Sequence, residues 1–148
     1  MSLKQRIGED VKQAMRAADK PRLTTLRMVT AAIKQREVDE RIELADSDVL
    51  AIIEKMIKQR RESAEQYRAG QRPELADAEE AEIAMLKVYL PEPLADSELD
   101  QLIDGAVAES GATGMAGMGA VMGLLKERVQ GRADMREVSA RVRARLSA

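Results

Sequence analysis

The chain has 148 residues but no phenylalanine and no tryptophan, and only Tyr67 and Tyr89 are aromatic. Any hydrophobic core must therefore be built from leucine, isoleucine, valine, methionine and alanine. Sheet-rich cores usually draw on aromatic and β-branched residues, whereas leucine, methionine and alanine are strong helix formers. The composition therefore predicts an all-α protein.

Several segments before residue 90 carry apolar residues at the spacing of one helix face. Turn signals separate these segments: Pro21 suits the first turn of a helix, and Gly70 followed by Pro73 suits the end of one. We therefore expect an N-terminal helical domain of about four helices over residues 1–90. The expected helices cover residues 3–18, 21–41, 46–69 and 74–90.

The clearest break in the chain is the Pro-Glu-Pro sequence at residues 91–93. Two prolines so close together cannot continue a helix, and each favours extended geometry at the residue before it. We place a domain boundary here, followed by a C-terminal three-helix bundle over residues 91–148. Its first helix is expected to be capped by Asp96 or Ser97 and to end at Ser110.

Residues 114–134 are rich in glycine and methionine, and they predict the second helix of the bundle. Apolar residues at i, i+3, i+4, i+7 and i+11 from Met118 form one helix face. Gly119 and Gly123 lie one turn apart, although each glycine within a helix costs roughly 1 kcal/mol relative to alanine. Something is therefore expected to approach the backbone closely, either a neighbouring helix or a binding partner. Gly131 is expected to end the helix.

The last helix is expected to begin at Asp134, with Glu137 completing a capping box. It carries Val138, Val142 and Leu146 at the spacing of a buried face. Three short amphipathic helices joined by short connections are typical of a small bundle.

Histidine and cysteine are both absent from the chain. A histidine general base, a Cys–His nucleophile pair and a thiolate metal site are therefore excluded. The sequence also lacks the glycine-lysine motif of nucleotide-binding loops. Its many carboxylates fall on polar helix faces, with no apolar pocket that would raise a pKa. We therefore predict no catalytic residue, no metal site and no cofactor.

No apolar run approaches the length of a membrane span, and no signal-peptide segment is visible. From this we predict a cytoplasmic protein with no membrane partner.

Charge is unevenly distributed along the chain, whose net charge is −2. Residues 74–110 hold 11 acidic side chains against 1 basic one, whereas residues 1–73 hold 16 Lys/Arg against 12 Asp/Glu. The two basic flanks suit nucleic acid, and the alternative is that they are ordinary solvated helix faces. The basic residues singled out in the first flank are Arg36, Arg41, Lys55, Lys58, Arg60 and Arg61.

The basic set near the C-terminus suits contact with an RNA backbone. No aromatic residue lies there to stack on a base, so base-specific recognition is not expected. We expect Arg132 to be exposed, because it follows the helix-ending Gly131. The members of the set are Lys126, Arg128, Arg132, Arg136, Arg141, Arg143 and Arg145.

A series of short motifs runs through the second half of the chain in a definite order. Tyr89-Leu90-Pro91 is followed by Leu94, an acidic helix start, Met118-Gly119 and Val121-Met122-Gly123, and then by Gly131-Arg132-Ala133-Asp134, Val138-Ser139 and Leu146. This order resembles the GatB/YqeY family. That family comprises small stand-alone YqeY proteins, whose length this chain shares, and the C-terminal tail of the B subunit of the tRNA-dependent amidotransferase.

The resemblance implies an all-helical fold in two parts and a link to glutamine-dependent amidation on tRNA. It also implies that the stretch around the glycines corresponds to the part of the tail that faces tRNA. Many relatives carry a lysine between the Met-Gly and Val-Met-Gly motifs, where this chain has Ala120. The candidate tRNA-binding residues are Gly119, Gly123, Lys126, Arg128, Arg132 and Arg136.

Three hypotheses for the function are open at this point. The first is a binding module that holds tRNA or a tRNA-linked enzyme. The second is a component of a glutamine-dependent carbon–nitrogen ligase whose active site lies on partner subunits. The third is a protein–protein adaptor with no nucleic acid, favoured by Ala120 and by the acidic middle segment.

The purified protein alone should show neither glutaminase nor ATPase activity, because it lacks histidine, cysteine and a nucleotide-binding loop. Release of ammonia from glutamine and of phosphate from ATP measures this directly. Glutamine hydrolysis that persists through further purification, and that a point mutation removes, would contradict the prediction.

Overall fold

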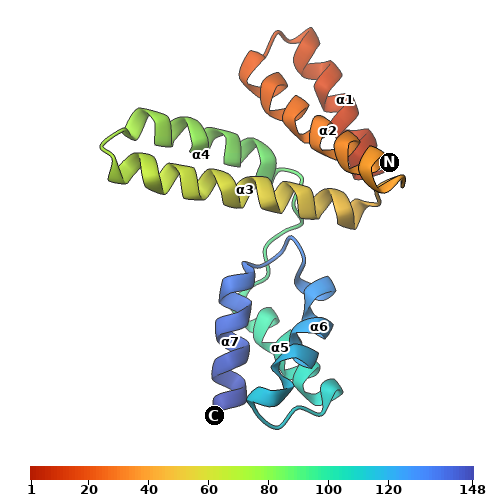
Figure 1. The fold of residues 1–148 in the computed structure, drawn as a ribbon, viewed down its shortest axis with the longest axis vertical. Helices are drawn as coiled ribbons and strands as arrows, with labels where there is room; N and C mark the ends of the chain where they lie inside the picture. Colours follow the sequence, from red (N-terminus) through yellow and green to blue (C-terminus); the bar gives the residue numbers. More distant parts are fainter. The chain divides into compact units, whose positions relative to one another are not determined.

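A computed structural model describes all of residues 1–148, which form two compact units. Unit 1 is Met1–Leu90 and unit 2 is Pro91–Ala148. Both units contain only helices (Figure 1), so the predicted all-α fold is confirmed. Unit 1 holds α1 (Leu3–Arg16), α2 (Lys20–Glu40), α3 (Asp46–Ala69) and α4 (Pro73–Lys87). Unit 2 holds α5 (Asp96–Ser110), the short 3-10 helix η1 (Met115–Gly117), α6 (Met118–Val129) and α7 (Met135–Ser147).

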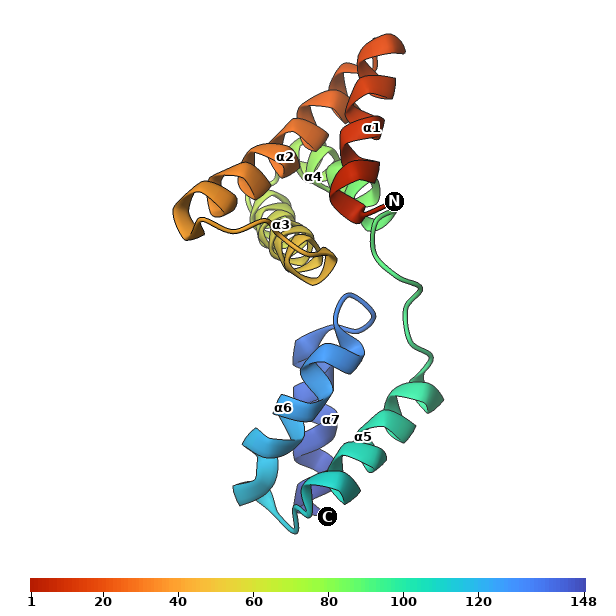
Figure 2. The same cartoon turned by 90° about the vertical axis from the view of Figure 1, so that its right-hand side faces the viewer.

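Unit 1 consists of two helical hairpins, α1–α2 and α3–α4, which cross at an angle (Figure 2). The hairpins bury one shared core in which Tyr89 is the only aromatic residue. Its aliphatic side chains come from all four helices, as the composition requires. The buried members are Ile7, Ala14, Leu26, Val29, Ile33, Leu44, Val49, Ile53, Met56, Ile57, Ile83, Leu86 and Tyr89.

Tyr89 fixes the end of unit 1. Helix α4 ends at Lys87, earlier than predicted, and Tyr89 then turns into the core. The Tyr89 hydroxyl donates a hydrogen bond to Asp10 Oδ2 at 2.5 Å, and the Arg6 guanidinium lies 4.9 Å from the ring centroid. Burial and the Asp10 carboxylate raise the pKa of Tyr89, so the phenol stays protonated and continues to donate. The residues that precede the Pro-Glu-Pro break are thereby held against α1.

Unit 2 is a three-helix bundle with a core of its own, to which each of its α-helices contributes. The core contains no aromatic residue, so it is filled entirely by aliphatic side chains. Its buried members are Leu99, Ile103, Ala106, Val107, Val121, Leu125, Val129, Val138, Val142 and Leu146.

The start of α5 differs from the prediction that Asp96 or Ser97 caps it. The helix begins at Asp96, so Ala95 occupies the cap position and has no side-chain oxygen to offer. Instead the Glu98 carboxylate reaches back and accepts a hydrogen bond from the Ala95 backbone N–H at 3.3 Å. An acidic residue one turn inside the helix thus serves the purpose that a capping side chain would serve.

A fragment Pro91–Ala148 should be helical by circular dichroism, because its core is formed within unit 2. Residues 91–94 belong in the fragment, since the Leu94 backbone N–H donates to the Arg132 carbonyl at 2.9 Å. Such a small bundle is expected to be only marginally stable, with a low midpoint in thermal denaturation. An unfolded fragment beside a folded full-length chain would show that the two units fold as one cooperative domain.

Candidate nucleic-acid interface

One side of α6 packs into the core of unit 2, and the opposite side, which we call its bare side, is exposed. Val121, Leu125 and Val129 are fully buried in the core of unit 2. Gly119 and Gly123 lie on the opposite, exposed side, and a Cβ atom added at either position would meet nothing within 4 Å. No helix of unit 2 therefore packs against these glycines, and close packing within the unit is not the reason for them.

The glycine that does permit a close approach is Gly117, at the end of η1. A Cβ atom there would lie 2.4 Å from Cβ of Ala112, which is a steric clash. The loop between α5 and α6 can therefore close only if residue 117 has no side chain. The sequence pattern pointed to Gly119 and Gly123 for close packing, whereas the close contact is at Gly117. Helical periodicity could not identify Gly117, because a loop has no repeating spacing of residues.

Helix α5 holds one arginine of α7 with two carboxylates, and a third carboxylate comes from α7 itself. The Arg141 guanidinium lies 3.0 Å from Asp96, 2.9 Å from Asp100 and 3.0 Å from Glu137. Hydrogen bonds to Glu137 and Asp100 raise the pKa of Arg141. Glu137 was predicted to complete a capping box with Asp134, and this is wrong: its carboxylate is turned along α7 towards Arg141 instead.

Two more ion pairs identify the sides of α6 and α7 that face α5. Arg145 of α7 lies 3.1 Å from Asp104, and Arg128 of α6 lies 2.7 Å from Glu109. Both acidic partners belong to α5. The positive charge on these sides of the bundle is therefore matched by carboxylates of the same unit.

The side chains of three cations of unit 2 have neither an ion pair nor a hydrogen bond: Lys126, Arg136 and Arg143. Lys126 lies three residues after Gly123, so it shares the bare side of α6. Arg136 and Arg143 are seven residues apart, so they share one side of α7, at an angle away from the side that pairs with α5. We call this surface the α6–α7 face; it comprises Gly119, Gly123, Lys126, Arg136, Ala140 and Arg143.

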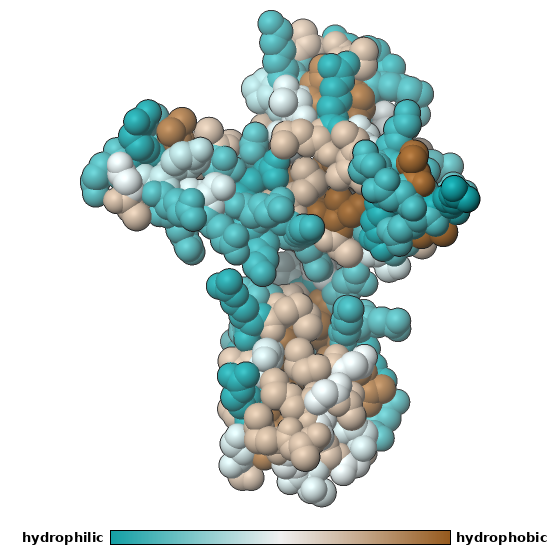
Figure 3. Space-filling view, viewed as in Figure 1, coloured by the Kyte–Doolittle hydropathy of each residue, from teal (hydrophilic) through white to brown (hydrophobic).

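Figure 3 views unit 2 with α6 in front of α5, as Figures 1 and 2 together show. Pale and brown residues cover the middle of the visible surface, and hydrophilic residues lie mostly around its edges. The side of the bundle seen in this view is thus weakly apolar at its centre, with hydrophilic residues around it.

Arg132 is not the exposed residue that the sequence predicts. Its side chain is partly buried, and Nε donates a hydrogen bond to the Glu92 carbonyl at 2.9 Å. Its own carbonyl accepts from the Leu94 N–H at 2.9 Å. Arg132 therefore joins the loop between α6 and α7 to the segment that leads into α5.

The structure brings four of the six candidate residues onto the α6–α7 face, and Ala120 is exposed beside them. Arg128 is paired with Glu109, and Arg132 is held by Glu92, so neither carries a free charge to that face. Arg143 belongs to the face although it was not among the candidates. Its position seven residues after Arg136 is the signal that identifies it. The four candidates on the face are Gly119, Gly123, Lys126 and Arg136.

Two of the six basic residues singled out in unit 1 form ion pairs within the unit. Arg36 forms ion pairs with Glu40 and Asp48, at 2.5 and 3.4 Å. Arg60 is buried and lies 2.9 Å from Glu82. Two of the singled-out arginines are therefore neutralised within the unit.

No group of three acidic, histidine or cysteine side chains is arranged to hold a metal ion. None of the helices combines the length and the apolar character that crossing a membrane requires.

The fold and this surface define a class of all-helical proteins with two units, in which the C-terminal bundle carries a glycine-rich helix. The family described as Yqey-like protein matches the chain over residues 4–146. The chain belongs to this family, as the order of its motifs predicts.

Several curated relatives are fungal proteins with the name "Altered inheritance of mitochondria protein 41, mitochondrial". The one from Pyrenophora tritici-repentis is 33% identical over 140 residues, which cover 93% of this chain and 77% of the relative. The one from Lachancea thermotolerans is 35% identical over 106 residues, covering 70% of this chain and 57% of the relative. For the Saccharomyces cerevisiae protein the values are 33% over 92 residues, 62% of this chain and 50% of the relative. The chain thus spans about half the length of the last two.

The predicted cytoplasmic location is contradicted by these comparisons, since the names of the relatives place those proteins in mitochondria. The prediction relied on the lack of an apolar segment. Proteins of different aqueous compartments share the lack of such a segment, so its absence does not distinguish one compartment from another.

Replacing Arg132 with alanine should destabilise unit 2 by about 1 kcal/mol, because the hydrogen bond to the Glu92 carbonyl is lost. Arg136→Ala is the matched control, since its guanidinium has no partner and its stability should change by less than about 0.5 kcal/mol. Urea denaturation of both variants in the Pro91–Ala148 fragment, or in the full chain, measures the difference. Equal stabilities would show that the Arg132 contact contributes nothing.

Proposed function

We propose that this protein is an RNA-binding module whose target is transfer RNA, and that the α6–α7 face holds the RNA backbone. The observation that carries the proposal is the coincidence of two features on one surface. Lys126 shares the exposed side of α6 with Gly119 and Gly123, which have no side chains and no neighbour within 4 Å of an added Cβ, and helical spacing puts Arg136 and Arg143 on the side of α7 turned away from α5.

The glycines support this proposal through their cost. Two exposed glycines in a twelve-residue helix lower its stability by roughly 1 kcal/mol each relative to alanine. Nothing within unit 2 compensates for this cost at Gly119 or Gly123. A partner that must come close to the helix backbone does compensate, and a ribose-phosphate chain is such a partner.

The cations support the RNA-binding proposal because they have no ion-pair partner within the protein. An arginine already held by a carboxylate gains little from a phosphate, whereas Lys126, Arg136 and Arg143 exchange only water and counterions for it. With no aromatic residue in unit 2 to stack on a base, recognition rests on backbone shape and charge.

The resemblance to the tail of the tRNA-dependent amidotransferase supports transfer RNA over other RNA. We further propose that the protein works beside a glutamine-dependent carbon–nitrogen ligase, with the chemistry carried out by the partner enzyme. In that arrangement this chain positions the tRNA and needs no catalytic group of its own.

Binding of bulk tRNA should be weak and sensitive to salt. The triple variant Lys126→Gln/Arg136→Gln/Arg143→Gln should bind more weakly. If all three cations contact phosphates, the negative slope of log affinity against log salt should become less steep by about 2. Fluorescence anisotropy with labelled tRNA at several salt concentrations measures both quantities. Lys12→Gln/Lys55→Gln/Lys58→Gln in unit 1 removes the same charge elsewhere, and its affinity should change little.

Gly123→Leu separates binding from stability. A leucine at this open position should stabilise α6 by roughly 1 kcal/mol, because leucine is a much better helix former than glycine. The same side chain should keep an RNA backbone away and weaken binding, whereas Ala120→Lys beside it should strengthen binding about fivefold, on the scale of one charge-assisted contact.

The contrary outcome is equally clear. If wild type and all of these variants bind tRNA alike, or none binds at low salt, the α6–α7 face is not an RNA surface. The protein–protein adaptor then becomes the better hypothesis, with the exposed methionines of unit 2 as its contact residues: Met115 and Met135 are 44% and 37% exposed.

A further inference from the structure

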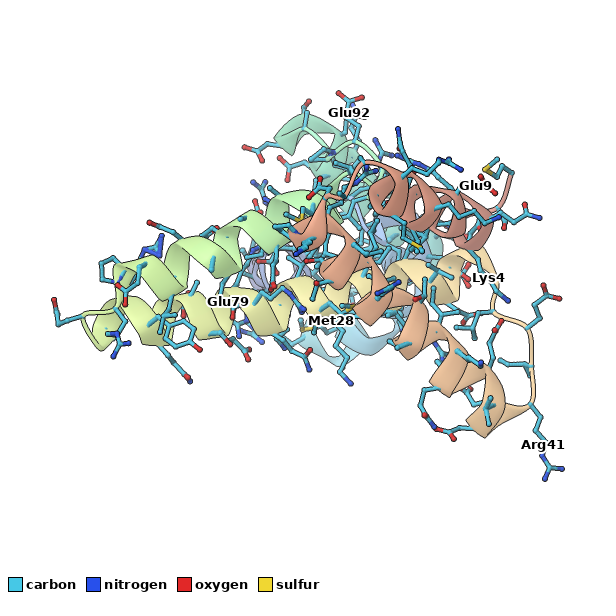
Figure 4. The ribbon with its side chains drawn as sticks, turned by 90° about the horizontal axis from the view of Figure 1, so that it is seen from above. Lys4, Glu9, Met28, Arg41, Glu79 and Glu92 are labelled. Atoms are coloured by element: carbon cyan, nitrogen blue, oxygen red, sulfur yellow. The ribbon has the colours of Figure 1, made fainter.

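A second surface, on unit 1, has a regular arrangement of charge. Lys20, Arg27, Lys34 and Arg41 follow one another at intervals of seven residues, from the first residue of α2 to its C-cap. All four are exposed, and none of their side chains has an ion-pair or hydrogen-bond partner. Figure 4 shows the Arg41 side chain extending away from the end of α2. The four cations form one row along the outer side of the helix.

The other arginines of α2 are used within unit 1. Arg22 lies 3.8 Å from Asp10 of α1, and Arg36 lies 3.4 Å from Asp48 of α3 in addition to its pair with Glu40. Only the outward row lacks counter-charges. The row therefore does not simply reflect a helix rich in basic residues, since the arginines on the other sides of α2 are paired with carboxylates.

The positions between the cations carry small uncharged or apolar residues. Thr24, Ala31 and Val38 alternate with the row at intervals of three and four residues. Met28 lies at the edge nearer α3, where its sulfur accepts a hydrogen bond from Arg60 Nη2 at 3.5 Å. Val38 is 64% exposed and Met28 is 46% exposed, although α2 already buries an apolar side in the core. Helix α2 thus presents a second, shallow apolar seam flanked by positive charge.

We propose that this outer side of α2, the α2 seam, is a docking surface for an acidic amphipathic helix of a partner protein. Alternating intervals of three and four residues are the spacing at which the two helices of a coiled coil meet along a seam. Cations seven residues apart recur about every 10 Å, so the row extends over about 31 Å. A partner helix with Asp or Glu at the same interval places one carboxylate beside each cation.

Other occupants fit the seam less well. A second copy of this chain would bring four cations against four cations, and Asp39 at the edge of the seam is the one exposed carboxylate of α2 without an ion pair to relieve the repulsion. An RNA backbone winds, so a straight row of this length follows it only in part. A lipid surface requires large apolar side chains to insert, and Thr24 and Ala31 offer little.

The first probe is a synthetic four-heptad helical peptide with alanine and leucine along its seam and glutamate flanking it. The matched control peptide has glutamine in place of every glutamate. The full-length protein should bind the acidic peptide and not the control, and binding should weaken as salt is added. Arg27→Glu/Lys34→Glu should reduce the affinity at least about tenfold, since two attractions become repulsions.

Two further variants test the location and the shape of the surface. Lys55→Glu/Lys58→Glu changes the net charge equally on α3, where both lysines are exposed, and should alter peptide affinity less than about twofold. Ala31→Arg adds a cation but fills the seam. A docked helix should then bind several-fold more weakly, whereas RNA or an anionic vesicle should bind more strongly.

Three results would overturn the proposal. The acidic peptide could fail to bind the wild type at low salt, or bind both charge-reversed variants alike. Ala31→Arg could strengthen peptide binding, which would show simple charge attraction. Finally, Arg27→Glu/Lys34→Glu could abolish binding of tRNA or of phosphatidylserine vesicles while leaving the peptide bound, which would assign the row to one of those partners. The first two results leave the α6–α7 face untouched, because it lies in the other unit. Loss of tRNA binding in Arg27→Glu/Lys34→Glu would also count against the α6–α7 face as the main tRNA surface.

Discussion

The packing of ten aliphatic side chains in unit 2 places α5 across α6 and α7, and the surface of the unit depends on that placement. Without an aromatic residue to fill space, the helices must approach closely, and Gly117 leaves the room that the loop needs beside Ala112. Once α5 is in place, its carboxylates lie beside Arg128, Arg141 and Arg145 and hold them. The charges that remain free are those turned away from α5.

The two surfaces that we infer arise in the same way, from cations that the ion pairs of the fold leave free. On each unit, ion pairs within the fold neutralise part of a basic segment and leave a defined remainder. On the α6–α7 face the remainder surrounds helix backbone that has no side chains, which suits a phosphate chain. On the α2 seam it forms a straight row at a seven-residue interval beside apolar residues, which suits another helix.

Much of the fold is visible in the sequence because helices depend on neighbours three and four residues apart. The helix order, the break at residues 91–93 and the buried faces of α5, α6 and α7 follow from such local patterns. The exceptions involve competition for a partner. Glu137 had a capping position available but pairs with Arg141, and Arg132 looked exposed beside Gly131 but binds the Glu92 carbonyl.

By itself, then, the sequence determined that the protein is helical, that it lacks the side chains for thiol or imidazole chemistry, and which motifs relate it to the YqeY-like family. Only the tertiary structure decided which of its arginines keep a free charge and which glycines lie open. The reason is physical: the pairs Arg141–Asp100 and Arg145–Asp104 join residues 41 positions apart. Their formation depends on how two helices lie against each other, and no local spacing in the chain records that.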